Sequence, residues 1–142
     1  VSGFIADAMR EIEAFLRLYP NSKYTPDVLA LQRTARDRLS DSEFRVGLFY
    51  FRSRWYRGAI PRFESILKTN PEYLRRDGVY YHLAESLLRT GRPKEAFSMF
   101  TKLVDEFKVS DYLEDASARI TELTRLRDSA QPQPVGAMAA PP

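Results

Sequence analysis

The hydrophobic positions along the chain recur at intervals of three and four residues, which is the period of an amphipathic α-helix. In the first segment, Phe4, Ala8, Ile12 and Phe15 fall on one face of such a helix. No stretch shows the alternation of apolar and polar residues that marks a half-buried strand. The sequence therefore predicts an all-α protein.

Prolines, glycines and capping residues divide this pattern into helices. Pro20 ends the first helix, because a proline disfavours helical geometry in the residue before it. Thr25 and Pro26 begin the next, since threonine can cap a helix and proline is tolerated at its first position. We expect one long helix over about 26–54, with a break near residues 40–42 as the alternative. Shorter helices are expected at about 57–69, 73–90, 93–107 and 111–128.

The sequence repeats itself when it is shifted by 37 residues. Ala59 then aligns with Ala96 and Phe63 with Phe100, and in both copies an aliphatic residue follows three positions after the phenylalanine. A small residue and a large aromatic on one helical face let two helices approach closely and fill the space between them. Each copy is therefore expected to be a pair of antiparallel helices.

This spacing resembles the tetratricopeptide repeat (TPR), whose second helix carries Ala-x3-Phe and is followed by a closing proline. Two repeats are expected, at about 40–71 and 77–108, and residues 3–20 fit the second helix of an incomplete earlier repeat. Two departures are visible: the connecting helix is over-long, and Glu43 lies where the repeat prefers an aromatic residue. The expected architecture is a TPR-type α-solenoid of antiparallel helix pairs over residues 1–128.

Composition limits what this architecture can contain. The chain has 142 residues, of which 44% are hydrophobic, and it has no cysteine. It is therefore long enough for one core, and disulfides and thiolate metal sites are excluded. No apolar run approaches the length of a membrane-spanning helix. Residues 131–142 contain four prolines and no charge, so we expect a disordered tail over 129–142.

The formal charge of +3 is distributed unevenly. Residues 33–62 hold eight arginines and three acidic residues, a net charge of +5. Such a patch can attract nucleic acid, anionic lipid or an acidic protein surface, and it can equally be a solvated helix face. Aromatic residues interleave with arginines over residues 49–57, which also suits a stacking platform for RNA. The sequence alone leaves these alternatives open.

Residues able to catalyse a reaction are sparse. His82 is the only histidine, and it lies between tyrosines and a leucine in an expected helix, where packing is its simplest role. Glu85 and Glu95 belong to different helices and have no evident acid–base partner. The sequence has no nucleotide-binding, zinc-protease or serine-hydrolase motif. We therefore expect no enzymatic activity, no metal and no cofactor.

One stretch carries a narrower resemblance. Tyr19-Pro20-Asn21-Ser22, Tyr24 and the over-long helix are similar to the BamD family, the lipoproteins of bacterial outer-membrane barrel assembly, and the resemblance covers about residues 7–127. It implies a non-catalytic scaffold, the C-terminal part of a subunit that docks on the central barrel-assembly protein and accessory lipoproteins. No small-molecule substrate is expected, and nucleic acid is disfavoured.

The same resemblance implies a location at the periplasmic face of the outer membrane. Because the chain begins with Val1 rather than methionine, we expect its N-terminus, with any targeting signal, to lie upstream. The resemblance implies that a lipidated cysteine and earlier repeats also lie there. The membrane would then be contacted only through a lipid anchor outside this chain. A cytoplasmic location is the alternative.

The first helix of each TPR pair lines the inner surface of the solenoid. In that register the expected partner-binding residues are Phe44, Leu48, Phe51, Arg52, Arg54, Tyr81, Glu85 and Arg89. Two other readings of the same surface stay open. One is a generic TPR adaptor that binds a partner peptide, and the other is an RNA-binding helical repeat.

Overall fold

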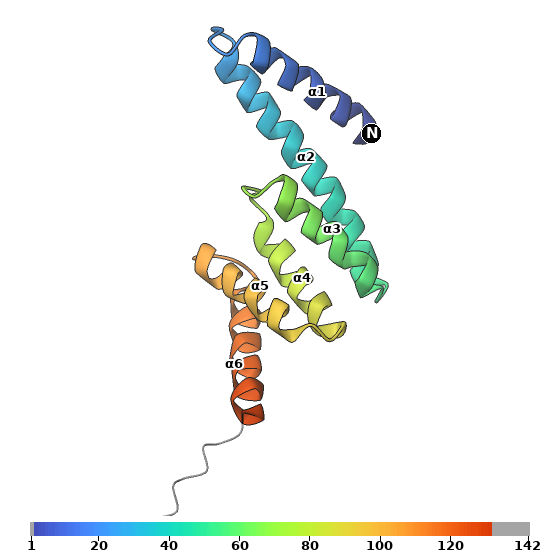
Figure 1. The fold of residues 1–142 in the computed structure, drawn as a ribbon, viewed down its shortest axis with the longest axis vertical. Helices are drawn as coiled ribbons and strands as arrows, with labels where there is room; N and C mark the ends of the chain where they lie inside the picture. Colours follow the sequence, from blue (N-terminus) through green and yellow to red (C-terminus); the bar gives the residue numbers. More distant parts are fainter. Residues whose placement is uncertain (1, 132–142) are drawn as a thin grey trace, which may run out of the picture.

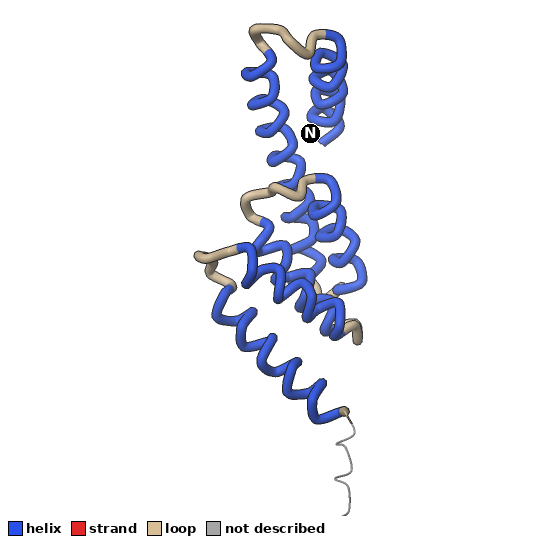
Figure 2. Tube along the Cα trace, turned by 60° about the vertical axis from the view of Figure 1, so that its left-hand side comes forward, coloured by secondary structure: helices blue, strands red, loops and turns tan. Residues whose placement is uncertain are grey.

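The computed structural model describes residues 2–131, and within them the chain folds into helices alone (Figure 1). They are α1 (Ser2–Leu18), α2 (Thr25–Arg52), α3 (Tyr56–Thr69), α4 (Arg76–Arg89), α5 (Pro93–Glu106) and α6 (Leu113–Ala130). Each helix packs against the next one in the sequence, which gives an elongated stack with α1 at one end and α6 at the other. Figure 2 shows the same stack with its short connecting loops. The predicted all-α, TPR-type solenoid is confirmed.

The connecting helix α2 is one continuous helix of 28 residues rather than two. Its start differs from the predicted threonine cap, because Tyr24 is the N-cap residue and the Thr25 hydroxyl donates a hydrogen bond to the carbonyl of Tyr19. The Ser22 hydroxyl accepts a hydrogen bond from the Tyr24 N–H at 3.2 Å. The same serine–tyrosine turn precedes α6, where Ser110 and Tyr112 make the equivalent bond at 3.1 Å.

The length of α2 separates the helices that pack on it. α1 lies along its first half and α3 along its second half (Figure 1). At the end of α3, the buried Asn70 donates hydrogen bonds to the Asp37 carboxylate and the Ser40 hydroxyl, both at 2.9 Å. Arg33 forms an ion pair with the same Asp37. This polar network fixes the middle of α2 to the turn that follows α3.

The core follows the small–aromatic spacing of the repeat. Ala59, Phe63, Ala96 and Phe100 are all fully buried in one cluster. The ring of Phe63 packs on Gly47 of α2, where an added Cβ would lie 2.5 Å from a ring carbon. The missing side chain at Gly47 therefore allows α2 and α3 to approach closely.

Two helix boundaries, the start of α3 and the end of α6, differ from the prediction. α3 begins at Tyr56, one residue before the expected start, and Pro61 is its sixth residue and lies inside the helix. A proline there cannot donate a hydrogen bond to the carbonyl of Arg57. α6 continues to Ala130 and so takes in the first residues of the expected tail. The rest of the expected tail, from residue 132, lies outside the described residues.

Candidate functional site: the inner face of the helix stack

Partly exposed side chains from three helical elements form one face of the stack. Phe51 of α2 lies against His82 of α4, with 4.9 Å between ring centroids, and His82 lies 5.5 Å from Tyr112 just before α6. Tyr81 stacks on Tyr112 with 4.9 Å between centroids. Leu48, also partly buried, packs against the core from α2. We call these five residues the inner face; it is a surface of neutral rings.

His82 is held neutral at the centre of this face. Its Nδ1 lies 2.7 Å from the carbonyl oxygen of Gly78, so the neutral ring donates its proton there. Burial lowers the pKa of His82, and the positive charge of Arg52 lowers this pKa further, against the opposing effect of the hydrogen bond. The charge of Glu85 acts on this pKa in the opposite direction, but its carboxylate is paired with Arg119, so the ring of His82 serves packing.

Two arginines stand at one end of the inner face. Arg52 and Arg89 are the last residues of α2 and α4, and both are exposed. Arg89 lies over the ring of Tyr56, with 5.6 Å between the guanidinium carbon and the ring centroid. Within residues 2–131 neither arginine forms an ion pair. Both guanidinium groups are therefore open to an acidic group of a partner.

Two of the expected partner-binding residues, Phe44 and Glu85, are buried and have contacts inside the fold. Phe44 is only 2% exposed because it sinks between helices, against Phe63 and beside Gly78. The buried carboxylate of Glu85 accepts two hydrogen bonds from the guanidinium of Arg119, at 2.7 and 3.0 Å. Neither side chain can contact a partner without breaking these internal interactions.

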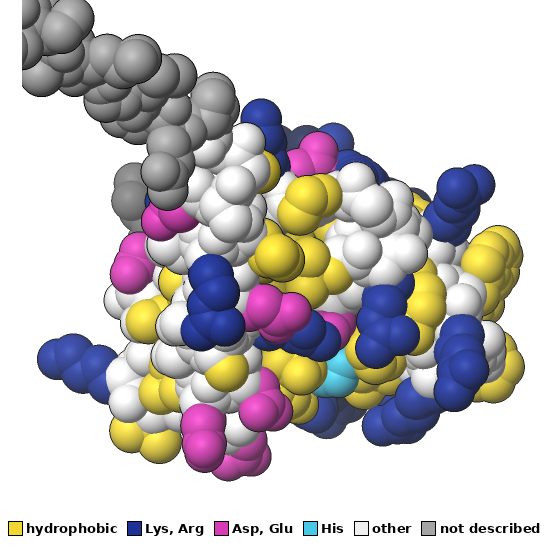
Figure 3. All heavy atoms as spheres, turned by 90° about the horizontal axis from the view of Figure 1, so that it is seen from below, with side chains coloured by type: hydrophobic (Ala, Val, Ile, Leu, Met, Phe, Trp, Pro, Cys, Tyr) yellow, Lys and Arg dark blue, Asp and Glu magenta, His cyan; other side chains and the backbone are white. Residues whose placement is uncertain are grey.

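Arg54, another expected partner-binding residue, lies in the turn that joins α2 to α3. Its side chain is exposed, and its φ of 61° places it in the left-handed region. Figure 3, which views the molecule from below, shows Lys and Arg side chains gathered on the side away from the grey trace, with hydrophobic side chains between them. Leu48, Phe51, Arg52, Arg54, Tyr81 and Arg89 remain predicted contacts.

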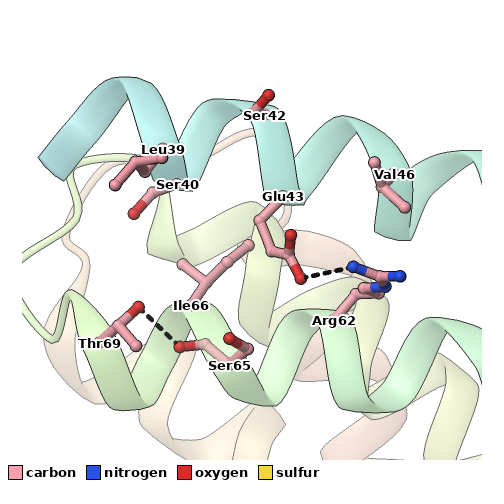
Figure 4. Close-up of a pocket in the computed structure, with 9 residues that line it drawn as sticks. All are labelled: Leu39, Ser40, Ser42, Glu43, Val46, Arg62, Ser65, Ile66 and Thr69. Atoms are coloured by element: carbon pink, nitrogen blue, oxygen red, sulfur yellow. Dashed lines mark hydrogen bonds and ion pairs between the residues drawn. The ribbon is translucent and has the colours of Figure 1, made fainter. Parts of the chain in front are cut away.

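A hollow of about 290 Å³ lies between α2 and α3. Figure 4 shows Glu43 reaching across it to Arg62, with 3.2 Å between their charged atoms. Ser42, Ser65 and Thr69 are among the residues that line it, and the Thr69 hydroxyl donates a hydrogen bond to the carbonyl of Ser65. The sequence marked Glu43 only as a departure from the repeat. In the structure, Glu43 of α2 forms an ion pair with Arg62 of α3, where the repeat usually has an aromatic contact between its helices.

The sequence-based prediction missed Tyr112, which belongs to the inner face, and Arg119 of α6, which pairs with Glu85. A signal was present, because Arg119 lies 34 residues after Glu85, which is one TPR length. An acid and a base at that spacing can meet across neighbouring first helices. The prediction considered only the first helices of two complete repeats, so the contribution from α6 was not anticipated.

Within residues 2–131, no helix combines the length and the hydrophobicity needed to cross a membrane. This part of the chain also brings together no group of three or more histidine or acidic side chains that could hold a metal ion.

Comparison with known proteins places the chain in a family. No curated protein matches its sequence significantly. The family described as YfiO, outer membrane lipoprotein, matches residues 3–86, which is more than half of the chain and ends within α4. The resemblance to the BamD-like lipoproteins is thereby confirmed. The chain belongs to the YfiO family of outer membrane lipoproteins.

Proposed function

We propose that this chain is a non-catalytic protein–protein scaffold, the C-terminal part of a subunit of the outer-membrane β-barrel assembly machinery. The observation that carries the proposal is the inner face, where Arg52 and Arg89 flank neutral aromatic rings in a chain of this family. Aromatic and arginine side chains are the residues that most often anchor protein interfaces. The surface suits a partner more than it suits a reaction.

The proposed partner is the central barrel-assembly protein, with accessory lipoproteins beside it, at the periplasmic face of the outer membrane. The family supports the outer-membrane setting, and the open guanidinium groups of Arg52 and Arg89 support contact with acidic residues of the partner. An apolar side chain of the partner would lie on Phe51 and Tyr81. Enzymatic activity has no place in the proposal, because His82 is committed to packing.

The test is co-purification with the purified central barrel-assembly protein in detergent solution, without lipid vesicles. We expect Arg52→Glu combined with Arg89→Glu to weaken binding by about tenfold or more, since each reversal removes a charge-assisted contact. The matched control is Arg38→Glu combined with Arg45→Glu, which makes the same charge change on exposed positions of α2. Equal retention of both variants would remove the inner face from the docking surface.

A generic peptide-binding adaptor is the second candidate, because Arg52 and Arg89 are exposed at the ends of α2 and α4. The same co-purification experiment distinguishes the adaptor from the docking subunit. An adaptor of this kind would fail to retain the barrel-assembly protein at all, whereas a docking subunit would retain it. An RNA-binding role is less favoured, because Phe51 and Trp55 are engaged by neighbouring rings rather than aligned for stacking bases.

A further inference from the structure

Two turns lie on the same side of the helix stack, at the lower right in Figure 1. One joins α2 to α3 and the other joins α4 to α5. Residues 52–57 and 89–94, which include these turns, contain no acidic residue and carry six cations: Arg52, Arg54, Arg57, Arg89, Arg92 and Lys94. We call these two segments the basic turn edge.

Two turns on the opposite side of the stack, between α3 and α4 and between α5 and α6, are different. Residues 70–75 and 107–112 each contain one acidic and one basic residue, so both are neutral. In the basic turn edge, Arg92 alone has an acidic partner within residues 2–131, namely Glu95. Positive charge is therefore concentrated on one edge of the solenoid, and of the six cations there only Arg92 is paired with an acidic residue among the described residues.

The only tryptophan of the chain lies in the middle of this edge. Trp55 stands against Tyr50, with 4.8 Å between ring centroids, and over Gly58, where a Cβ would come within 2.6 Å of the indole. These contacts hold the ring in place while 57% of the residue remains exposed. A rigid, half-exposed indole beside arginines is the combination found where proteins meet a membrane interface.

The backbone conformation of Arg54 independently indicates that the positive charge of the basic turn edge has a functional role. Gly91 occupies the equivalent place 37 residues later and has the same left-handed backbone. Glycine adopts the left-handed conformation without strain, whereas a residue with a Cβ adopts it only with steric strain. The chain keeps an arginine where the turn itself favours glycine, and strained positions of this kind are concentrated at functional sites.

We propose that the basic turn edge rests on anionic lipid headgroups, with Arg54 and Arg57 on phosphate groups and Trp55 at the level of the interface. The observations favour a membrane over other polyanions, because Trp55 offers an amphipathic ring and the family is attached to the outer membrane. The inference goes beyond the proposed docking function, since it assigns a second contact in addition to any lipid anchor. Its outcome does not depend on the partner protein.

The test uses the intact chain with vesicles of phosphatidylcholine, alone or mixed with phosphatidylglycerol, and follows the fluorescence of Trp55. We expect a blue shift of the emission with the mixed vesicles only, and a loss of binding as salt is added. One basic residue near an anionic surface contributes about fivefold to partitioning. Arg54→Glu combined with Arg57→Glu is therefore expected to reduce partitioning by about 25-fold or more.

Arg38→Glu combined with Arg45→Glu is the matched control, because it makes the same change of net charge at exposed positions of α2 outside the edge. It should leave most of the binding intact. Arg54→Gly removes one charge at a position where glycine suits the backbone, so its expected fivefold loss cannot arise from misfolding. An unshifted Trp55 emission, equal losses in the control, or binding to an acidic polypeptide or RNA without binding to vesicles would each overturn the proposal.

Discussion

Arg54 and Gly91 occupy the same position in two successive repeats, and both have a left-handed backbone, with φ of 61° and 77°. In both turns the N–H of this residue bonds to the carbonyl three residues before it, at 3.0 and 3.2 Å. The N–H of the next residue bonds to the carbonyl five residues before it, at 2.9 Å in both turns. These bonds form the Schellman ending of a helix, where glycine is the usual residue.

The arginine at this position is expected to cost stability. Because its Cβ crowds the neighbouring backbone in the left-handed conformation, Arg54→Gly should raise the free energy of unfolding by about 1 kcal/mol. Urea unfolding followed by circular dichroism measures the difference. The reciprocal change, Gly91→Arg, should lower the free energy of unfolding by a similar amount. An unchanged midpoint for Arg54→Gly would mean that contacts of the arginine side chain offset the strain.

Phe63 should be among the most sensitive core positions. It is fully buried against Gly47, so Phe63→Ala removes a whole ring and leaves a cavity between α2 and α3. We expect a loss of about 3 to 5 kcal/mol in the free energy of unfolding. Gly47→Ala should also destabilise the protein, because the added methyl would overlap the same ring. A loss below about 1 kcal/mol for Phe63→Ala would contradict the assigned repeat register.

The fold could be predicted because its signals are local. Ala59 and Phe63 lie four residues apart on one helix and recur as Ala96 and Phe100, so the sequence carries the helix pairing twice. The turn chemistry was less readable. Arg54 takes the left-handed position without being glycine, and only the backbone reveals that it corresponds to Gly91.

The candidate site could be predicted only in part, since the extent to which a side chain is buried depends on the neighbouring helices. Phe44 and Phe51 share one face of α2, yet Phe44 sinks into the core because Gly78 of α4 leaves room for its ring. A pattern along one helix cannot show which of two such rings has a glycine opposite. Glu85 is a similar case, because its burial is explained only by Arg119 on α6.

The pairing of Glu85 with Arg119 gives a further prediction. Arg119→Met would keep the aliphatic part of the side chain but leave the buried Glu85 carboxylate without its partner. Because an unpaired buried charge is costly, we expect a loss of about 3 kcal/mol in the free energy of unfolding. Arg125→Met, at an exposed position of the same helix, is the control and should change stability by less than about 0.5 kcal/mol. Similar values for the two variants would show that solvent already compensates Glu85.

His82 should make the stability of the protein depend on pH in a defined window. Burial among Phe51, Tyr81 and Tyr112 lowers the pKa of His82, and Arg52 adds to this effect. The unfolded chain therefore binds a proton on this residue more readily than the folded chain.

The stabilisation from neutral His82 is present above the ordinary histidine pKa of about 6.5, and it is lost as the pH falls below that value. The slope cannot exceed about 1.4 kcal/mol per pH unit for one proton. Asp37, whose pKa is lowered chiefly by its hydrogen bond from Arg33, loses its contribution only in more acidic solution, so the two effects are separable. Urea unfolding at a series of pH values should show the slope in the native chain and its absence in His82→Gln. The same slope in both proteins would show that His82 is not its source.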